Sequence, residues 1–267
     1  NKINRDVISF TPSLQYNILK NLVAKTKLTF TYKTDLPGYY SPSYLPVASI
    51  NMTGGTAART DWRQKKYLSE TTLNYNFKKR GHNLELLGGF TAEKTITENA
   101  YMGGSGYIDD NLKYFNMAAL KDKEGLSISS YYHIKTNMSV LARVNYSYKR
   151  RYYATVTMRA DGASNFAKGK KWGYFPAAAL RWSISNEKWL KHTHWLNDLS
   201  LRVSAGRSGN DAVASYQSLA TLTAATSSWM FGNTRELSYV PSKLENSNLT
   251  WETTDSFNVG LNFAAFN

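Results

Sequence analysis

The sequence contains no cysteine, which excludes structural disulfides, thiolate zinc sites and cysteine nucleophiles. It also lacks any apolar run of about 18 residues, the length that a membrane-spanning helix needs. Acidic residues are scarce: 19 stand against 33 lysines and arginines, so the formal net charge of the 267 residues is +14. The mean hydropathy is −0.47, which leaves open any membrane protein whose strands have only one apolar face.

The positive charge first suggests nucleic acid as a partner. However, the basic residues are scattered along polar faces and turns, as at residues 78–80 and 149–151. No basic helix, RNA-binding sheet signature or zinc-finger spacing occurs, so we predict no nucleic-acid partner. Basic residues at the rim of a β-barrel meet lipid phosphates or line a pore for anionic cargo, and both uses stay open here.

Apolar and polar residues alternate with period two over long segments. From Val140 to Tyr148 the even positions are apolar, and after a turn at residues 149–151 the same pattern resumes at Tyr152. Successive side chains of a strand point to opposite faces, so each segment has one apolar and one polar face. With 19 Tyr and 7 Trp, whose rings suit a membrane interface, the pattern favours an all-β fold, part of a large antiparallel transmembrane β-barrel.

About nine strands are expected, over residues 14–20, 25–34, 66–79, 83–97, 127–148, 152–160, 172–185, 199–209 and 251–263. Short connections fall near residues 21–24, 80–82, 149–151 and 186–198, the last with room for a short helical turn. Long ones fall near 35–65, 98–126, 162–171 and 210–250. Outer-membrane barrels alternate short periplasmic turns with long extracellular loops, so this order favours a barrel over a soluble sandwich. Pro176 lacks a backbone donor and is expected at a strand end or bulge.

Three blocks of sequence resemble a stretch shared by SusC/RagA-type TonB-dependent transporters. They are RADGASNF with WGYFPAAALRWSISNE (residues 159–166 and 172–187), LSLRVSAGRSGN (199–210) and NLTWETTDSFNVGLNF (248–263), in the family's order. Weaker similarity covers residues 68–110. The resemblance implies a barrel of about 22 strands in the outer membrane of a Gram-negative bacterium. We therefore expect residues 1–267 to be a segment of a TonB-dependent receptor β-barrel domain, without the plug domain, signal peptide and closing strands.

The resemblance also implies partners and cargo. A TonB complex would act through an N-terminal region outside this chain, and a SusD-like surface lipoprotein would cover the extracellular face. The imported cargo would be oligosaccharides, that is glycan fragments, or in some members peptides. Outer-membrane lipid would contact the apolar wall.

Two sets of candidate site residues follow from the alternation and from the loops. The residues expected to face the barrel lumen, where they would meet the plug or passing cargo, are Arg143, Asn145, Arg159, Arg181 and Arg202. The residues whose rings could stack on sugars in the loops are Tyr39, Tyr40, Tyr101 and Tyr107. Packing within the loops is the competing role for these tyrosines.

No catalytic constellation, cofactor motif or metal-ligand spacing is found, so we predict a protein that is not an enzyme, with no cofactor and no metal. His192 and His194 share a strand face but have no acidic neighbour. Three alternatives stay open: a soluble carbohydrate-binding β-domain, a passive porin-type barrel, and an outer-membrane enzyme barrel. The first would bury its apolar faces, and the last would need an inward catalytic set, which we cannot assemble.

Overall fold

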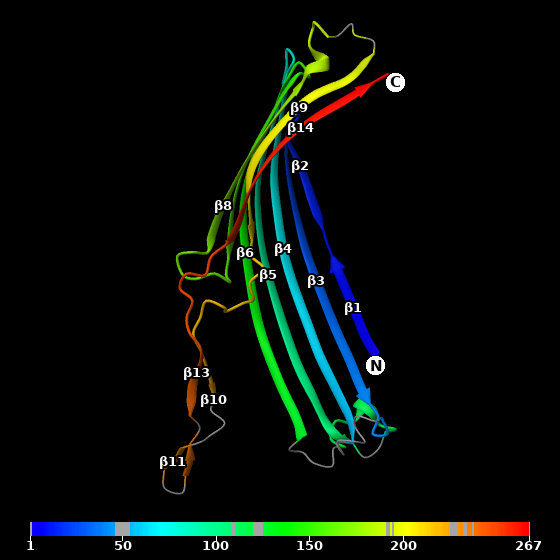
Figure 1. Cartoon of the computed structure of the whole chain (residues 1–267), viewed down its shortest axis with the longest axis vertical. Coiled ribbons are helices and arrows are strands. Elements are labelled where there is room, and N and C mark those ends of the chain that lie inside the picture. Colours follow the sequence, from blue (N-terminus) through cyan, green and yellow to red (C-terminus); the bar gives the residue numbers. More distant parts are fainter. Residues whose placement is uncertain are drawn as a thin grey trace. The chain divides into compact units, whose positions relative to one another are not determined.

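One ten-stranded sheet contains most of the chain (Figure 1). The computed structural model describes residues 2–45, 54–107, 110–119, 125–190, 193, 195–224, 229–231, 234–236 and 238–266. The strand order is β1-β3-β4-β5-β6-β7-β8-β9-β14, and β2 also pairs with β3. The predicted all-β class is therefore confirmed. The strands are β1 (Lys2–Phe10), β2 (Ser13–Leu19), β3 (Leu22–Ser41), β4 (Gly55–Lys79), β5 (His82–Tyr107), β6 (Leu126–Tyr148), β7 (Tyr152–Ala163), β8 (Trp172–Ser183), β9 (Leu196–Asn210) and β14 (Glu252–Ala265).

Contacts divide the chain into two compact units, and each is described by itself. The first unit comprises residues 1–12, 28–68 and 93–135, and the second comprises residues 13–27, 69–92 and 136–267. The described helices are short 3₁₀ turns, η1 (Lys113–Phe115) and η3 (Ile184–Asn186). No helix among the described residues has both the length and the apolar character to span a membrane.

The first strand is one that the sequence prediction missed. β1 pairs antiparallel with residues 30–38 of β3, and β2 pairs with residues 22–27 of the same strand. Pro12 lies between β1 and β2, and its carbonyl accepts a hydrogen bond from the Leu28 amide at 3.0 Å. β1 lacks clean alternation, since Val7 and Ile8 are adjacent apolar residues, and this hid it from a period-two search.

Three strands extend well beyond the predicted limits. β3 continues to Ser41, β4 begins at Gly55 and β5 continues to Tyr107, in stretches whose prolines and glycines had predicted loops. Pro37 lies opposite Ile3 in the ladder with β1, so pairing between strands overrides the local turn preference there. The predicted loop at 210–250 also holds strand pairs, β10 (Thr221–Ala224) with β13 (Tyr239–Lys243) and β11 (Trp229–Phe231) with β12 (Thr234–Glu236).

The predicted tight turns are confirmed. Arg80 and Gly81 have φ of 50° and 84°, and Lys149 and Arg150 have φ of 49° and 58°. Two consecutive residues with positive φ are typical of the two-residue hairpin turns that match strand twist. The Arg151 amide closes the second turn on the Tyr148 carbonyl at 2.9 Å.

Two finer expectations are met only in part. η3 (Ile184–Asn186) begins just before the 186–198 connection in which a helical turn was expected. Pro176 lies inside β8, opposite Met158, rather than at the strand end. The pairing of β8 with β9 begins at Ala177, so the proline stands where that ladder stops and its missing donor is tolerated.

Candidate functional site

The strand register of the second unit gathers the five predicted lumen residues on one face of the sheet. Directly opposed residues of antiparallel strands have side chains on the same face. Arg143 lies opposite Thr157, two residues before Arg159, and Asn145 lies opposite Thr155. Arg181 lies between Tyr153 of β7 and Arg202 of β9. The candidates therefore share a polar face, although whether that face lines a lumen stays a prediction.

Hydrogen bonds across strands order this polar face. Arg159 donates to the Asp161 carboxylate at 2.7 Å and to the Ser139 hydroxyl at 3.0 Å, so its charge is neutralised locally. Arg143 donates to Thr157 at 3.2 Å, and Thr155 donates to the Asn145 side-chain carbonyl at 3.0 Å. Apart from the Arg159–Asp161 pair, which lies within β7, these contacts join side chains of the neighbouring strands β6 and β7.

Two of the arginines border an open hollow of about 610 Å³ on the second unit. Arg181 stands 5.6 Å from the Tyr153 ring and 4.0 Å from the Asp198 carboxylate. Arg202 reaches across to Gly260, where an added Cβ would meet its guanidinium at 3.1 Å. In the part of the chain that the structure describes, Arg143 and Arg202 make no ion pair. Both guanidinium groups are thus available to an anionic or hydroxyl-rich ligand.

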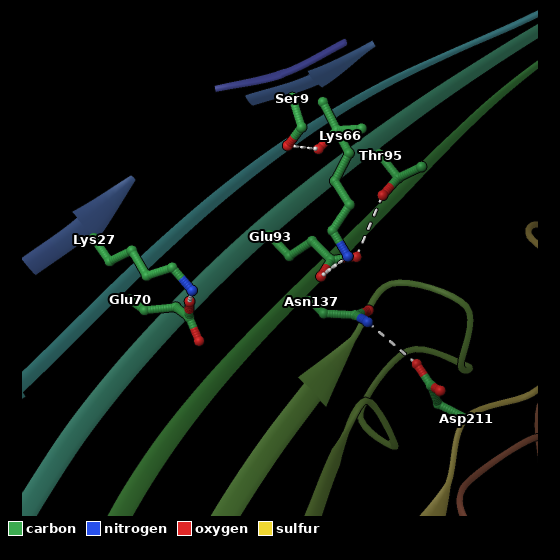
Figure 2. Close-up of polar contacts among 9 residues, drawn as sticks. Ser9, Lys27, Lys66, Glu70, Glu93, Thr95, Asn137 and Asp211 are labelled. Carbon is green, nitrogen blue, oxygen red and sulfur yellow. Dashed lines mark hydrogen bonds and ion pairs between the residues drawn. The ribbon is translucent and has the colours of Figure 1, made fainter. Parts of the chain in front are cut away.

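Polar contacts of the same kind cross the strands nearer the N-terminus (Figure 2). In the first unit, Lys66 of β4 and Glu93 of β5 reach toward one another and form an ion pair at 2.8 Å. In the second unit, Lys27 of β3 pairs with Glu70 of β4 at 3.3 Å. These partners were missed in the sequence. Counting outward from the turn at residues 80–81 places Lys66 opposite Thr95 and one diagonal step from Glu93, so the signal was present.

The opposite face of the same strands is apolar and uncovered. Val156 is 55% exposed and Leu180 is 58% exposed, although both lie in the middle of their strands. β14 continues this face with four large apolar side chains that are each at least 62% exposed, namely Phe257, Val259, Leu261 and Phe263. A water-soluble protein rarely exposes a contiguous apolar surface of this kind, so the face requires an apolar environment or partner.

An aromatic cluster ends the apolar face near the short turns. Tyr152 and Trp182 donate to the same carboxylate oxygen of Glu187, at 2.6 and 3.1 Å. Arg151 approaches the other oxygen at 3.2 Å. The hydrogen bond from Tyr152 above all, then that from Trp182 and the charge of Arg151, lower the pKa of Glu187 against the opposing effect of desolvation. Rings with satisfied polar tips suit a membrane interface.

The four tyrosines that were predicted in loops lie instead in strands β3 and β5, because pairing extends both strands into those stretches. All four belong to the first unit, and two of them pack together. Tyr107 is 1% exposed and forms a small core with Ala57. The Tyr40 ring packs edge-on against Tyr107, with 6.3 Å between ring centres, and the Tyr107 hydroxyl donates to the Met117 carbonyl at 3.3 Å. Packing is thus the role that the structure gives Tyr107, while cargo contact by these tyrosines stays a prediction.

Asp110 binds this cluster together, a role that the sequence pattern did not predict. Its carboxylate accepts hydrogen bonds from the Tyr40 hydroxyl and from both the amide and the hydroxyl of Ser43, the latter two at 3.1 and 2.9 Å. These donors, led by Tyr40, lower the pKa of the Asp110 carboxyl. Tyr39 is 46% exposed, and the Tyr101 hydroxyl lies over Gly103, where no Cβ would fit. Among the four predicted tyrosines, Tyr39 therefore has the most surface to offer a ligand.

No set of three or more His, Asp or Glu side chains is arranged to hold a metal in the described ranges. His192 and His194 lie outside the described residues.

Comparison with known proteins gives consistent results. The sequence profile described as "TonB dependent receptor-like, beta-barrel" matches residues 2–267. TonB-dependent receptor P3 of Formosa agariphila is 31% identical over 255 residues, which cover 94% of this chain and 24% of that protein. TonB-dependent receptor SusC of Bacteroides thetaiotaomicron is 34% identical over 178 residues, or 66% of this chain and 17% of SusC. The chain thus spans about a quarter or less of the length of these relatives.

Solved structures agree on the fold. A structure of the RagAB peptide transporter superposes with a TM-score of 0.79 at 23% identity, covering 99% of this chain and 29% of that one. The RagAB peptide importer in its closed-closed state gives 0.78 at 22% identity.

Proposed function

Because this chain belongs to the family of TonB-dependent receptor-like β-barrels, we propose that it forms part of the wall of an importer in the outer membrane of a Gram-negative bacterium. The observation that carries the proposal is the two-sided register of β6 to β9 and β14. It gives one hydrogen-bonded polar face with arginines and one exposed apolar face. A barrel wall between lipid and a watery lumen needs this division.

The lumen face would be the polar one, with Arg143, Arg181 and Arg202 toward the plug or the passing cargo. The short turns would face the periplasm and the long connections the cell exterior. Energy would come from a TonB complex acting through a region outside this chain. The protein is not an enzyme in this proposal, since the wall guides cargo and transforms nothing.

We propose glycan fragments as the cargo, with peptides as the second candidate. The resemblance of the sequence blocks to SusC/RagA-type transporters supports the first, and the likeness to the RagAB peptide importer keeps the second open. A SusD-like lipoprotein would cover the end with the long connections. Tyr39, together with Tyr40 of the same strand and Tyr101 of β5, would be the tyrosines to test for contact with sugar rings.

Uptake by cells that carry the intact protein tests this function. Labelled oligosaccharides and labelled peptides are supplied separately, with and without an intact TonB complex. Import of one class that stops without TonB supports the proposal and names the cargo. Import that continues without TonB would instead support a passive porin, and recovery of the protein in the soluble fraction without detergent would support a soluble carbohydrate-binding domain.

A further inference from the structure

The short-turn end of the second unit carries a concentration of unpaired positive charge. Lys79 and Arg80 end the β4–β5 hairpin, and Lys149 and Arg150 form the β6–β7 turn. All four are exposed, and they border a hollow of about 700 Å³ whose described lining contains no carboxylate. Within the described residues none of the four makes an ion pair, whereas the adjacent Arg151 is held by Glu187.

The backbone conformation of three of these cations is unfavourable for stability. Arg80, Lys149 and Arg150 have φ between 49° and 58°, in the left-handed region that favours glycine, asparagine or aspartate. The conformation of the second turn is nevertheless fixed, since Asn186 and Tyr153 both donate to the Arg150 carbonyl, at 2.9 and 3.2 Å. Cations at strained turn positions point to a use for the charge itself.

The cations lie beside the end of the apolar face. The Lys149 ammonium stands 4.9 Å from the centre of the Tyr148 ring. The His82 ring packs on Tyr148 at 4.5 Å and accepts or donates a hydrogen bond with the Tyr146 hydroxyl at 2.8 Å. Tyr146 and Tyr148 belong to the apolar face with Val144, so lipid that covers this face would bring its headgroups to the level of the turns.

We propose that Lys79, Arg80, Lys149 and Arg150, called here the basic rim, bind the phosphate groups of anionic phospholipids in the leaflet at the short-turn end. The apolar face would contact the acyl chains and the aromatic residues would lie at the boundary. This inference rests on the barrel function proposed above for its membrane setting. Each lysine or arginine near an anionic surface adds enough attraction to change affinity about fivefold.

The test compares two pairs of substitutions in the intact protein in nanodiscs of mixed phosphatidylcholine and phosphatidylglycerol. Lys149→Asn with Arg150→Gly removes two rim charges and installs the residue pair that this turn prefers, so the hairpin should become more stable. Lys168→Gln with Lys171→Gln removes the same charge from the β7–β8 connection. Native mass spectrometry then measures how far phosphatidylglycerol is enriched among the bound lipids.

We expect the parent and the Lys168/Lys171 control to enrich phosphatidylglycerol. The turn variant should lose enrichment by about fivefold per cation while its thermal stability is unchanged or higher. Equal enrichment in the turn variant, equal loss in the control, or displacement of the lipid by inorganic phosphate would each overturn the assignment. A protein that does not enter nanodiscs at all would overturn the barrel function as well, so the two failures are distinguishable.

Discussion

The two faces of the sheet formed by β6 to β9 and β14 differ in how their side chains are satisfied. On the polar face, Arg159 is bound by Asp161 and Ser139, and Asn145 by Thr155. On the apolar face, Val156 and Phe257 remain more than half exposed. The same strands form both faces, because successive side chains of a strand point to opposite sides of the sheet. The comparison teaches that contacts within the chain order the polar face, whereas the apolar face depends on its surroundings.

The largest effect should come from placing a charge on the apolar face. Val156→Lys should destabilise the intact protein in lipid vesicles by about 2–4 kcal/mol, the cost of a lysine near the middle of a membrane. Thr157→Lys, one residue further on the polar face, is the matched control and should cost far less. Urea unfolding in vesicles measures both. Similar losses at the two positions would show that both faces meet the same environment, and the barrel proposal would fail.

The next effect concerns the arginines of the polar face that make no ion pair. Arg202→Gln should slow import of acidic cargo roughly tenfold, because a charge-lined passage raises the local concentration of oppositely charged solutes. Neutral cargo of the same size should be affected little. The quantity to measure is the uptake rate of an acidic oligosaccharide divided by that of a neutral one, in the parent and in the variant. Arg207→Gln offers a comparison on the apolar side, where the arginine is already paired with Asp255 at 2.7 Å. An unchanged ratio in Arg202→Gln would remove this residue from the cargo path.

A smaller effect is expected at Glu187, at the short-turn end of the apolar face. The pKa of Glu187 is lowered in the folded state, so its contribution to stability is present above the ordinary value of about 4.5 and is lost as the pH falls through the folded value. In Glu187→Gln, the free energy of unfolding should therefore no longer contain this pH-dependent contribution, and the rest of its pH dependence should match that of the parent. Unfolding midpoints measured from neutral to acidic pH check this. If the parent and variant profiles run parallel, the carboxylate does not bind Tyr152 and Trp182 as described.

The regular part of this fold could be predicted from the sequence, because a strand with one apolar and one polar face shows a period-two alternation of apolar and polar residues. β6 to β9 and β14 were found for that reason, and Arg143, Asn145, Arg159, Arg181 and Arg202 were assigned to one face. The pattern fails where neither face is uniform, as in β1 and in the outer parts of β3 to β5. There, the strands are held by ladder pairing between residues far apart in the sequence. Arg5 of β1, for example, lies opposite Asp35 of β3, 30 positions away, and binds it at 2.6 Å.

The site was less predictable than the strands. Exposure depends on what the rest of the chain covers, so composition could not separate buried Tyr107 from exposed Tyr39. Asp110 and Glu187 each lie outside the strands and become important only through partners brought to them, Tyr40 in one case and Tyr152 in the other. Such residues carry no local pattern of their own.

The smallest effect is expected for the cross-strand ion pairs of the polar side, and its size shows whether these pairs contribute to stability. Lys66 and Glu93 are 36% and 24% exposed, so solvent screens their attraction and a double-mutant cycle should give about 0.2–1 kcal/mol. Lys66→Gln and Glu93→Gln, singly and together, supply the cycle, and Lys27 with Glu70 supplies a second pair at the longer distance of 3.3 Å. The coupling should fall in high salt, since exposed charges are screened. A coupling that is larger and insensitive to salt would mean that this side of the strands is shielded from bulk water, as it would be against a plug.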